Sequence, residues 1–243
     1  RSILQQHRLW LPLQADAKQR GIRLMLKPRT DVGRSLDRDE RQRLIETCGH
    51  SEAQHILPIV ALALLAGLRR NEIRLLRWRQ VDLIRRIVTV GKSKTEAGSG
   101  RLVPLNAQAV AIVTFWAQRW PGRRPDHYVF PAVRSGRPPD PTRPLQVWRR
   151  TWCTALRRAR VSCRFHDLRH SCVTSLLEGG APFSVVAALM GWSASTTAAM
   201  AKRYGHIGEA ALRRAVEVLD EPSLSLSVPI QAVTRIDDRA SVN

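Results

Sequence analysis

The side chain of greatest chemical interest in this sequence is Tyr204, one of only two tyrosines. It lies in the run Met200-Ala201-Lys202-Arg203-Tyr204-Gly205-His206. A phenol is a weak nucleophile because its ordinary pKa is about 10, but neighbouring cations favour the phenolate and also attract a phosphate. Tyr204 is therefore a candidate nucleophile toward a phosphodiester. The alternative is a tyrosine that packs, or lies on the surface, near the end of a helix.

His166 and Arg169 form a second candidate group, three positions apart in Phe165-His166-Asp167-Leu168-Arg169-His170. At this spacing both side chains can project from one face of the first turn of a helix. Histidine exchanges a proton near neutral pH, and a guanidinium can hold two nonbridging phosphate oxygens. The alternative is a capped helix start that carries surface charges.

A third candidate, Arg69, follows the apolar segment that ends in Ala66-Gly67-Leu68. Buried neighbours would hold an arginine on such a turn in place, as a preorganised phosphate clamp requires. Arg70 is the weaker candidate because it can simply be solvated. Glu72 can brace either arginine, or it can be a first-turn acid that the helix dipole favours.

Lysine is scarce, with five residues in the chain, and Lys92 and Lys94 both fall in the glycine-containing segment 91–100. A mobile ammonium group there can reach a DNA backbone and protonate a leaving 5′ oxygen. The alternative is a solvated hairpin whose charges discourage strand pairing at the sheet edge.

The elements that must position these residues follow from the hydrophobic pattern. A helix capped by Ser35 or Asp37 is expected first, with Leu36, Leu44 and Ile45 facing inward. The periodicity predicts further helices at 56–68, 71–77, 106–120, from 145 onward, 167–179, 182–190, 195–205 and 208–219, and strands at 81–83, 87–90 and 102–105.

Two segments between these elements have a distinctive composition. The stretch Pro121–Pro144 is rich in Pro, Arg and Gly and is predicted to be a long surface loop. After it, Leu145, Trp148, Trp152 and Leu156 form one apolar stripe at helical spacing, which favours core packing of the tryptophans over base stacking.

Charge indicates the class of partner. The chain has 40 Lys and Arg against 20 Asp and Glu, a formal net charge of +20, and all but five of the cations are arginine. This balance favours a nucleic-acid partner, the alternative being an arginine-rich genome and a solvated surface.

The four cysteines lack C-x-x-C spacing, so neither a zinc site nor a disulfide framework is expected. Because there is no secretory signal and no apolar run of about 20 residues, a cytoplasmic protein is expected.

The order of the motifs, over about residues 36–219, resembles the tyrosine recombinase/phage integrase family. The motifs that carry the resemblance are Gly67-Leu68-Arg69 with Glu72, the lysine hairpin closing on Leu102-Val103-Pro104-Leu105, His166–His170, Leu189-Met190-Gly191-Trp192, and Arg203-Tyr204-Gly205-His206. The resemblance implies, and the pattern supports, a mainly α-helical fold with a small three-stranded antiparallel β-sheet.

The resemblance also implies a role for each site residue. Arg69 and Arg169 would clamp the phosphate, Lys94 would be the general acid, and His166 would assist proton transfer. Trp192 stands where the family usually has a second histidine, although some members use tryptophan there. Tyr204 would form a 3′-phosphotyrosyl link and leave a free 5′ hydroxyl. Neither a metal ion nor ATP is expected as a cofactor, because these side chains can neutralise the charge of the phosphorane and the phosphotyrosyl bond stores the energy of the broken phosphodiester.

The implied organisation has three parts. Residues 1–35 would be a connector from an N-terminal DNA-clamping domain, 36–220 the catalytic domain and 221–243 a flexible tail, and the segment 208–243 would dock in cis or onto a neighbouring subunit. The implied partners are double-stranded DNA, three further copies of the chain in a tetramer on synapsed DNA, and accessory DNA-bending proteins, with no membrane. The setting would be a bacterial or phage-encoded protein that associates with the nucleoid.

Two departures and two rival functions accompany this interpretation. Trp192 replaces the commoner histidine, and the spacing from Trp192 to Tyr204 is about three residues longer than usual, close to one helical turn. Residues 193–198 are expected to absorb the difference as a longer loop. The rival functions are a type IB topoisomerase-like enzyme that relaxes DNA and a catalytically inactive DNA-binding relative.

Overall fold

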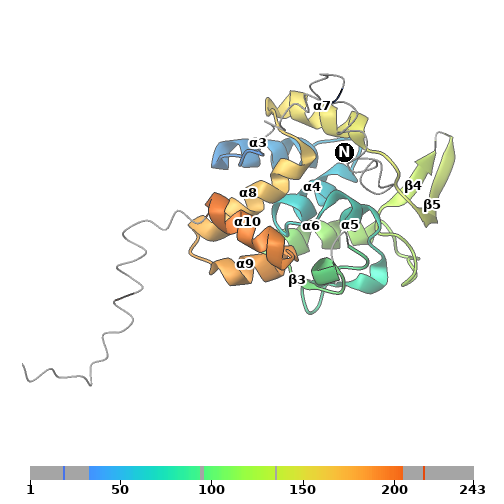
Figure 1. Ribbon diagram of the computed structural model, residues 1–243. Helices are drawn as coiled ribbons and strands as arrows, with labels where there is room; N and C mark the ends of the chain where they lie inside the picture. Colours follow the sequence, from blue (N-terminus) through green and yellow to red (C-terminus); the bar gives the residue numbers. More distant parts are fainter. Residues whose placement is uncertain (1–18, 20–32, 94–95, 135, 205–215, 217–243) are drawn as a thin grey trace, which may run out of the picture. The chain divides into compact units, whose positions relative to one another are not determined.

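The computed structural model describes residues 19, 33–93, 96–134, 136–204 and 216. The chain divides into two compact units, Arg1–Gly191 and Trp192–Asn243, which are described separately. The described part of the first unit contains helices α3 Arg38–Gly49, α4 Ile56–Leu64, α5 Arg70–Arg74, α6 Ala107–Gln118, α7 Arg149–Ala159, α8 Phe165–Glu178 and α9 Phe183–Met190, with 3-10 turns at Trp78–Gln80 and Glu96–Gly98. Its strands are β1 Val81–Asp82, β2 Ile87–Thr89, β3 Leu102–Pro104, β4 Pro131–Arg134 and β5 Arg137–Pro144 (Figure 1).

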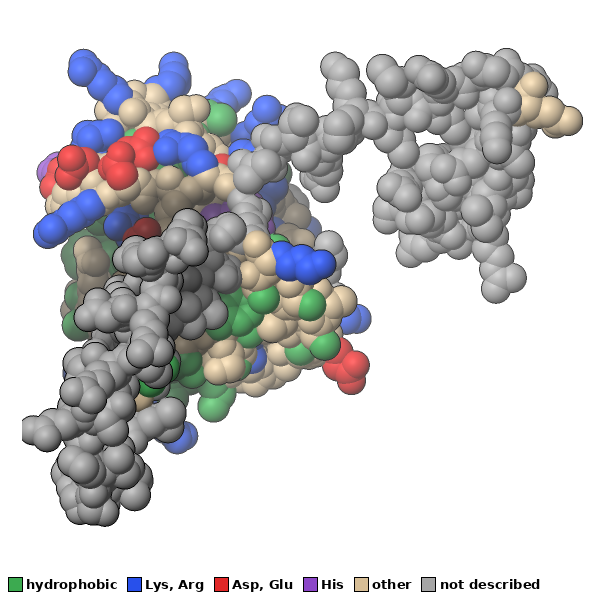
Figure 2. Space-filling model, turned by 60° about the vertical axis from the view of Figure 1, so that its left-hand side comes forward, with side chains coloured by type: hydrophobic (Ala, Val, Ile, Leu, Met, Phe, Trp, Pro, Cys, Tyr) green, Lys and Arg blue, Asp and Glu red, His purple; other side chains and the backbone are tan. Residues whose placement is uncertain are grey.

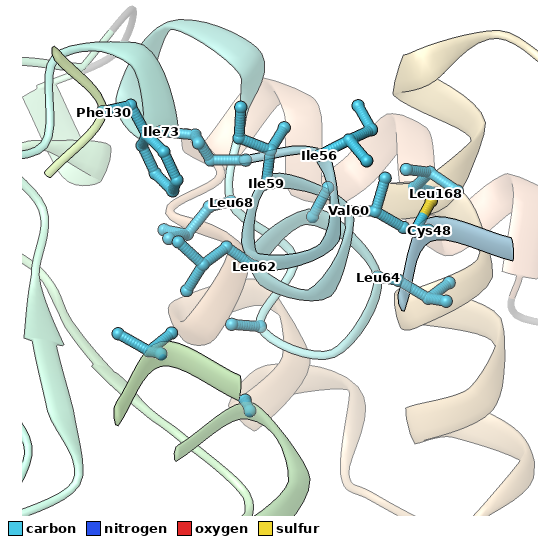
Figure 3. Close-up of a cluster of buried hydrophobic side chains, with 14 of the residues drawn as sticks. Cys48, Ile56, Ile59, Val60, Leu62, Leu64, Leu68, Ile73, Phe130 and Leu168 are labelled. Atoms are coloured by element: carbon cyan, nitrogen blue, oxygen red, sulfur yellow. The ribbon is translucent and has the colours of Figure 1, made fainter. Parts of the chain in front are cut away.

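Helix α4 lies at the centre of the first unit because it is apolar on all sides, and such a helix must be buried. Helices α3, α6 and α8 all pack against it. Figure 3 shows the side chains of α4 directed toward Leu168 of α8 and Cys48 of α3 on one side, and toward Ile73 and Phe130 on the other. The predicted helix over 56–68 ends four residues early, at Leu64, because the chain then turns through Gly67 in a left-handed conformation with φ +64°.

The first helix of this unit, α3, begins as its sequence predicts. The Asp37 carboxylate accepts a hydrogen bond from the Glu40 backbone N–H at 2.7 Å, and the Glu40 carboxylate accepts one from the Asp37 N–H at 3.2 Å. This capping box satisfies two N–H groups that the helix start would leave without partners. Leu36 and Leu44 are buried, as predicted, so the helix start is held by both its cap and its apolar face.

The predicted three-stranded antiparallel sheet is confirmed, with strand order β1-β2-β3. Val88 pairs with Val103 across the last two strands, and both side chains are fully buried. The segment 91–101 connects these two strands, so the sheet fixes where the lysine-bearing hairpin leaves the core.

A second, two-stranded sheet shows that the predicted surface loop over Pro121–Pro144 is wrong in its second half. Strands β4 and β5 pair in an antiparallel hairpin with two irregularities in register, and Figure 1 shows this hairpin at the edge of the unit, away from the helices. Proline lacks an N–H and has a fixed φ, but a strand in a two-stranded sheet has one unpaired edge and tolerates both. The Pro-rich composition therefore indicated irregular structure where an edge strand forms.

The tryptophans of the α7 segment pack in the core, as predicted. Trp148 and Trp152 are buried, and each meets the ring of Phe165 edge-to-face, at centroid distances of 5.7 and 5.4 Å. The arginines of the same helix lie off this stripe and are exposed: Arg149, Arg150, Arg157 and Arg158. Basic side chains project from the described surface in several directions (Figure 2).

In the second unit, helix α10 spans Ala194–Tyr204. The longer loop expected at 193–198 is therefore wrong. The Ser193 carbonyl accepts from the Thr197 N–H at 2.8 Å and its hydroxyl from the Thr196 N–H at 3.4 Å, so Ser193 starts the helix and the additional residues lengthen it. The helix predicted at 208–219 lies outside the described residues except for position 216. No helix in the described ranges is long and apolar enough to cross a bilayer.

Candidate functional site

Arg69 lies at the point where the buried end of α4 turns into α5. It is the N-cap residue of α5, with extended backbone angles of φ −74° and ψ 153°. The turn before it depends on Gly67 because its φ of +64° is left-handed, and a Cβ there would in addition lie 2.5 Å from Cε at the end of the Met190 side chain. Gly67 thus lets the backbone approach α9 closely, and Arg69 is placed beside the end of that helix.

Glu72 braces Arg69 and is also a first-turn acid of α5, so both interpretations that the sequence left open apply to it. One oxygen of Glu72 accepts from the Arg69 backbone N–H at 2.8 Å, and the other accepts from the Arg69 guanidinium at 2.8 Å and from the Ser93 hydroxyl at 2.6 Å. Arg70 instead is exposed and lies over the ring of Trp148, 5.0 Å from its centroid. Arg69 is therefore the arginine that is held in a fixed orientation.

A third arginine, Arg101, completes the environment of Glu72 and was not singled out by the sequence. Its guanidinium donates to both carboxylate oxygens of Glu72, at 3.0 and 2.8 Å, and the side chain of Arg101 is 6 % exposed. Burial alone would raise the pKa of Glu72, but the hydrogen bonds from Arg101, Ser93 and Arg69 outweigh this and lower the pKa to about 2. Glu72 is therefore ionised throughout the physiological range.

Arg169, on α8, is buried with 5 % of its surface exposed. Its guanidinium donates to the carbonyls of Gly67 and Met190, both at 2.5 Å. Burial, together with the charge of Arg69, lowers the pKa of Arg169 to about 9, so the side chain stays cationic at neutral pH. In the described part of the chain no carboxylate forms a salt bridge with Arg169. A buried cation held in this way by neutral carbonyls is suited to receive an anion.

The C-terminal end of α9 brings the three arginines together. Three consecutive carbonyls at this end each accept a hydrogen bond from one arginine: Leu189 from Arg101 at 2.9 Å, Met190 from Arg169 at 2.5 Å, and Gly191 from Arg69 at 3.3 Å. The last carbonyls of a helix lack partners within the helix and carry the negative end of its dipole, so they attract cations. The end of α9 thus aligns guanidinium groups from three distant segments.

His166 occupies the first turn of α8, three residues before Arg169. Its ring is exposed and meets the ring of His170 edge-on at 5.0 Å. Partial desolvation, and then the charge of Arg169, lower the pKa of His166 below its ordinary 6.5, so the imidazole is neutral at pH 7. The alternative of a capped helix start also applies here, because Asp167 accepts from the Arg164 N–H at 2.8 Å and stabilises the turn that carries His166.

The structure thus brings Arg69, Arg169 and His166 together in the first unit. Lys92 is exposed on the hairpin, and Lys94 lies outside the described residues. Trp192 and Tyr204 belong to the second unit, where both are half-buried and Tyr204 is the last residue of α10. Among the residues that the structure describes, no group of three or more His, Cys, Asp or Glu side chains is arranged to hold a metal ion.

Comparison with known proteins gives the family. Residues 34–210 match the phage integrase family. The chain belongs to this family. It is 30% identical over 188 residues to the integrase of Salmonella phage P22, which covers 74% of the chain and 46% of that protein. It is 34% identical over 161 residues to the tyrosine recombinase XerC of Xanthomonas campestris pv. campestris, which covers 65% of the chain and 47% of that protein.

Solved structures show the same fold for this integrase-family chain. The Tn1549 transposon integrase in complex with DNA superposes with a TM-score of 0.62 and 16% identity, over 87% of this chain and 76% of that one. XerA recombinase superposes with a TM-score of 0.57 and 22% identity, over 84% and 72%. The predicted fold class, mainly helical with small antiparallel sheets, is confirmed. The chain spans about half the length of the curated relatives it matches.

Proposed function

We propose that this chain is the catalytic part of a site-specific DNA recombinase, an integrase that cleaves and rejoins DNA strands through a 3′-phosphotyrosyl intermediate. The observation that carries the proposal is the buried, cationic Arg169 beside the braced Arg69. Two guanidinium groups and one carboxylate, Glu72, leave this cluster with excess positive charge even before Arg101 is counted. A phosphodiester is an anion that fits this arrangement, because its two nonbridging oxygens can accept hydrogen bonds from both guanidinium forks.

In the proposed reaction Arg69 and Arg169 hold the nonbridging oxygens of the scissile phosphate. Negative charge on these oxygens increases as the phosphorane forms, so cations aligned beforehand stabilise the transition state more than the ground state. Because Glu72 and the carbonyls at the end of α9 already orient the two guanidinium groups, little reorganisation is needed when the DNA binds. The indole N–H of Trp192 would supply a further donor to the same oxygens.

The proton transfers are assigned as follows. Neutral His166 accepts the phenolic proton of Tyr204 as its oxygen attacks phosphorus, the bond from phosphorus to the 5′ oxygen breaks, and Lys94 donates a proton to the leaving oxygen. The products are a 3′-phosphotyrosyl link and a free 5′ hydroxyl. Attack by the 5′ hydroxyl of a partner strand reverses each step, so that rejoining requires neither ATP nor a metal ion.

The proposed partners are double-stranded DNA, further copies of the chain in a tetramer on synapsed DNA, and accessory DNA-bending proteins. Support for DNA comes from the net charge of +20 and from structural neighbours solved with DNA, such as the Tn1549 integrase and XerH bound to its difH substrate. The proposed location is the cytoplasm of a bacterium, on the nucleoid when bound. The proposed boundaries remain a connector over 1–35, a catalytic domain over 36–220 and a tail over 221–243.

A covalent trapping assay tests the proposal. The purified chain and its Tyr204→Phe variant are each mixed with labelled, nicked duplexes that carry the native recombination site, denatured, and run on a gel with and without EDTA. The expected result is a protein-linked 3′ end that resists EDTA and is absent with Tyr204→Phe. Loss of the adduct in EDTA would refute the metal-free mechanism. Relaxation of supercoiled DNA without recombinant product from two sites would indicate a topoisomerase-like enzyme instead.

A further inference from the structure

Arg101 contacts three parts of the candidate site. Its Nε donates to the Leu189 carbonyl at 2.9 Å, and one terminal nitrogen donates to the Gly98 carbonyl at 2.8 Å. Both terminal nitrogens also reach the carboxylate of Glu72. A single buried side chain therefore joins the base of the lysine hairpin, the brace of Arg69 and the end of α9.

The bond from Arg101 to Glu72 determines how much of the Arg69 charge remains for a phosphate. Glu72 is 3 % exposed, and it faces Arg69 and Arg101 together. If Arg101 were absent, Arg69 would be the one cation among the described residues that pairs with this buried carboxylate, and the two charges would neutralise each other. With Arg101 present, the carboxylate is shared, and Arg69 is oriented by Glu72 without being neutralised by it.

The hairpin is held against the end of α9 at the same place. Gly191 has φ +57°, and a Cβ on it would lie 2.6 Å from Cα of Gly98 and 2.9 Å from Cδ of Arg101. This contact is backbone against backbone, so it fixes the distance between the hairpin base and the helix end. Arg101 bridges this contact with hydrogen bonds to the carbonyls of Gly98 and Leu189, and so also orients the hairpin base relative to the end of α9.

We propose that Arg101 is a positioning residue for the reaction, which orients Arg69 through Glu72 and sets the base of the lysine hairpin against the end of α9. In this role Arg101 acts through Glu72, Gly98 and Leu189 rather than by binding the phosphate itself. The inference rests on the proposed function for its effect on cleavage, but its effect on the Arg69 site can be measured without DNA.

Two variants test this role, Arg101→Gln and Arg101→Lys, with Arg85→Gln as the matched control, since Arg85 is an exposed arginine on the turn between β1 and β2. The first readout is the Kd for inorganic phosphate, measured by calorimetry, with Arg69→Gln marking the loss of the site. The second is the single-turnover rate of adduct formation on saturating nicked DNA, compared with the Kd for the same DNA.

The expected result is a phosphate affinity close to that of Arg69→Gln and a cleavage rate lower by about 10²-fold, the usual effect of a misplaced catalytic group, with the DNA Kd changed less than about threefold. Arg101→Lys keeps the buried charge, and it provides the test if the Arg101→Gln variant does not fold. It lacks the fork that reaches Glu72 and Leu189 together, so it should recover less than about a tenth of the wild-type rate.

The outcomes separate the two proposals. If wild type binds phosphate through Arg69 but forms no adduct on its native recombination site, the proposed function fails and the phosphate measurement alone decides the role of Arg101. If both Arg101 variants retain wild-type phosphate affinity, or cleave within about twofold of wild type, the positioning role is refuted. If wild type binds phosphate no better than Arg69→Gln, the clamp and the role of Arg101 are refuted together.

Discussion

Replacing Gly191 by alanine should destabilise the chain more than replacement of any glycine that lacks its contacts. The backbone of Gly191 is left-handed, with φ +57°, and an alanine in that region costs about 1–2 kcal/mol. The new Cβ would also lie 2.6 Å from Cα of Gly98 and 3.2 Å from the Ala97 carbonyl oxygen. Both neighbours are backbone atoms that cannot rotate away, so overpacking adds about 1–3 kcal/mol. The expected loss in the free energy of unfolding is about 2–5 kcal/mol, the sum of these two effects.

Two matched glycines separate the two effects. Gly100 has φ +73°, and a Cβ on it would meet nothing within 4 Å, so Gly100→Ala should cost only the backbone strain, about 1–2 kcal/mol. Gly49 has neither a positive φ nor a neighbour, and Gly49→Ala should be neutral or stabilise by up to about 1 kcal/mol. Urea denaturation of the three variants gives the values. Equal losses for Gly191→Ala and Gly100→Ala would refute the close contact between the hairpin and α9.

Three further predictions concern single side chains. Glu72→Gln should lower the free energy of unfolding by about 3–5 kcal/mol at neutral pH, because it leaves buried arginines without their carboxylate. The pKa of Glu72 is lowered from 4.5 to about 2, so the stabilisation by its carboxylate is complete above pH 4.5. The difference between the variant and wild type in denaturation experiments should therefore shrink as the pH falls toward 2. Asp37→Ala, measured in the same way, should cost about 1 kcal/mol through loss of the α3 cap. The cleavage rate at subsaturating DNA, which reports the protein before DNA binds, should rise with pH to a plateau with a midpoint below 6.5, because His166 must be neutral to accept a proton. A midpoint above 6.5 would contradict this role.

Much of the fold could be predicted because hydrophobic periodicity decides burial locally. Helix α4 is apolar on every face, and the alternation in β2 and β3 leaves one orientation for Val88 and Val103. The β4–β5 hairpin could not be predicted in the same way, since composition signals turns but does not show whether a Pro-rich segment finds a partner strand. The helix predicted at 195–205 is confirmed to within one residue as α10, but the longer loop expected at 193–198 was wrong. Ser193 favours a loop and a helix cap equally until its hydrogen bonds are known.

The candidate site was predictable only where a residue type was rare or its motif was distinctive. His166, Tyr204 and the lysines are few enough for their positions to carry information, and Arg69 follows a marked turn. Arg101 is one of many arginines in a strongly basic chain, and nothing in its local sequence distinguishes it from those on the surface. The role proposed for it depends on a contact with Glu72, 29 positions away, which only the folded chain reveals. Rare residues therefore suggested the proposed chemistry, whereas the folded chain shows which residues surround Arg69.

The row of carbonyls at the end of α9 has a consequence for how this site tolerates change. The groups that align the three arginines belong to the backbone of residues 189–191, so the alignment does not depend on which side chains stand at Leu189 and Met190, provided that they still fill the core. A single-residue insertion or deletion in α9 is a different matter, because it would rotate every later carbonyl by about 100° around the helix axis and separate each from its arginine. Sequence drift by substitution is thus compatible with this site, whereas a change of length in α9 is not.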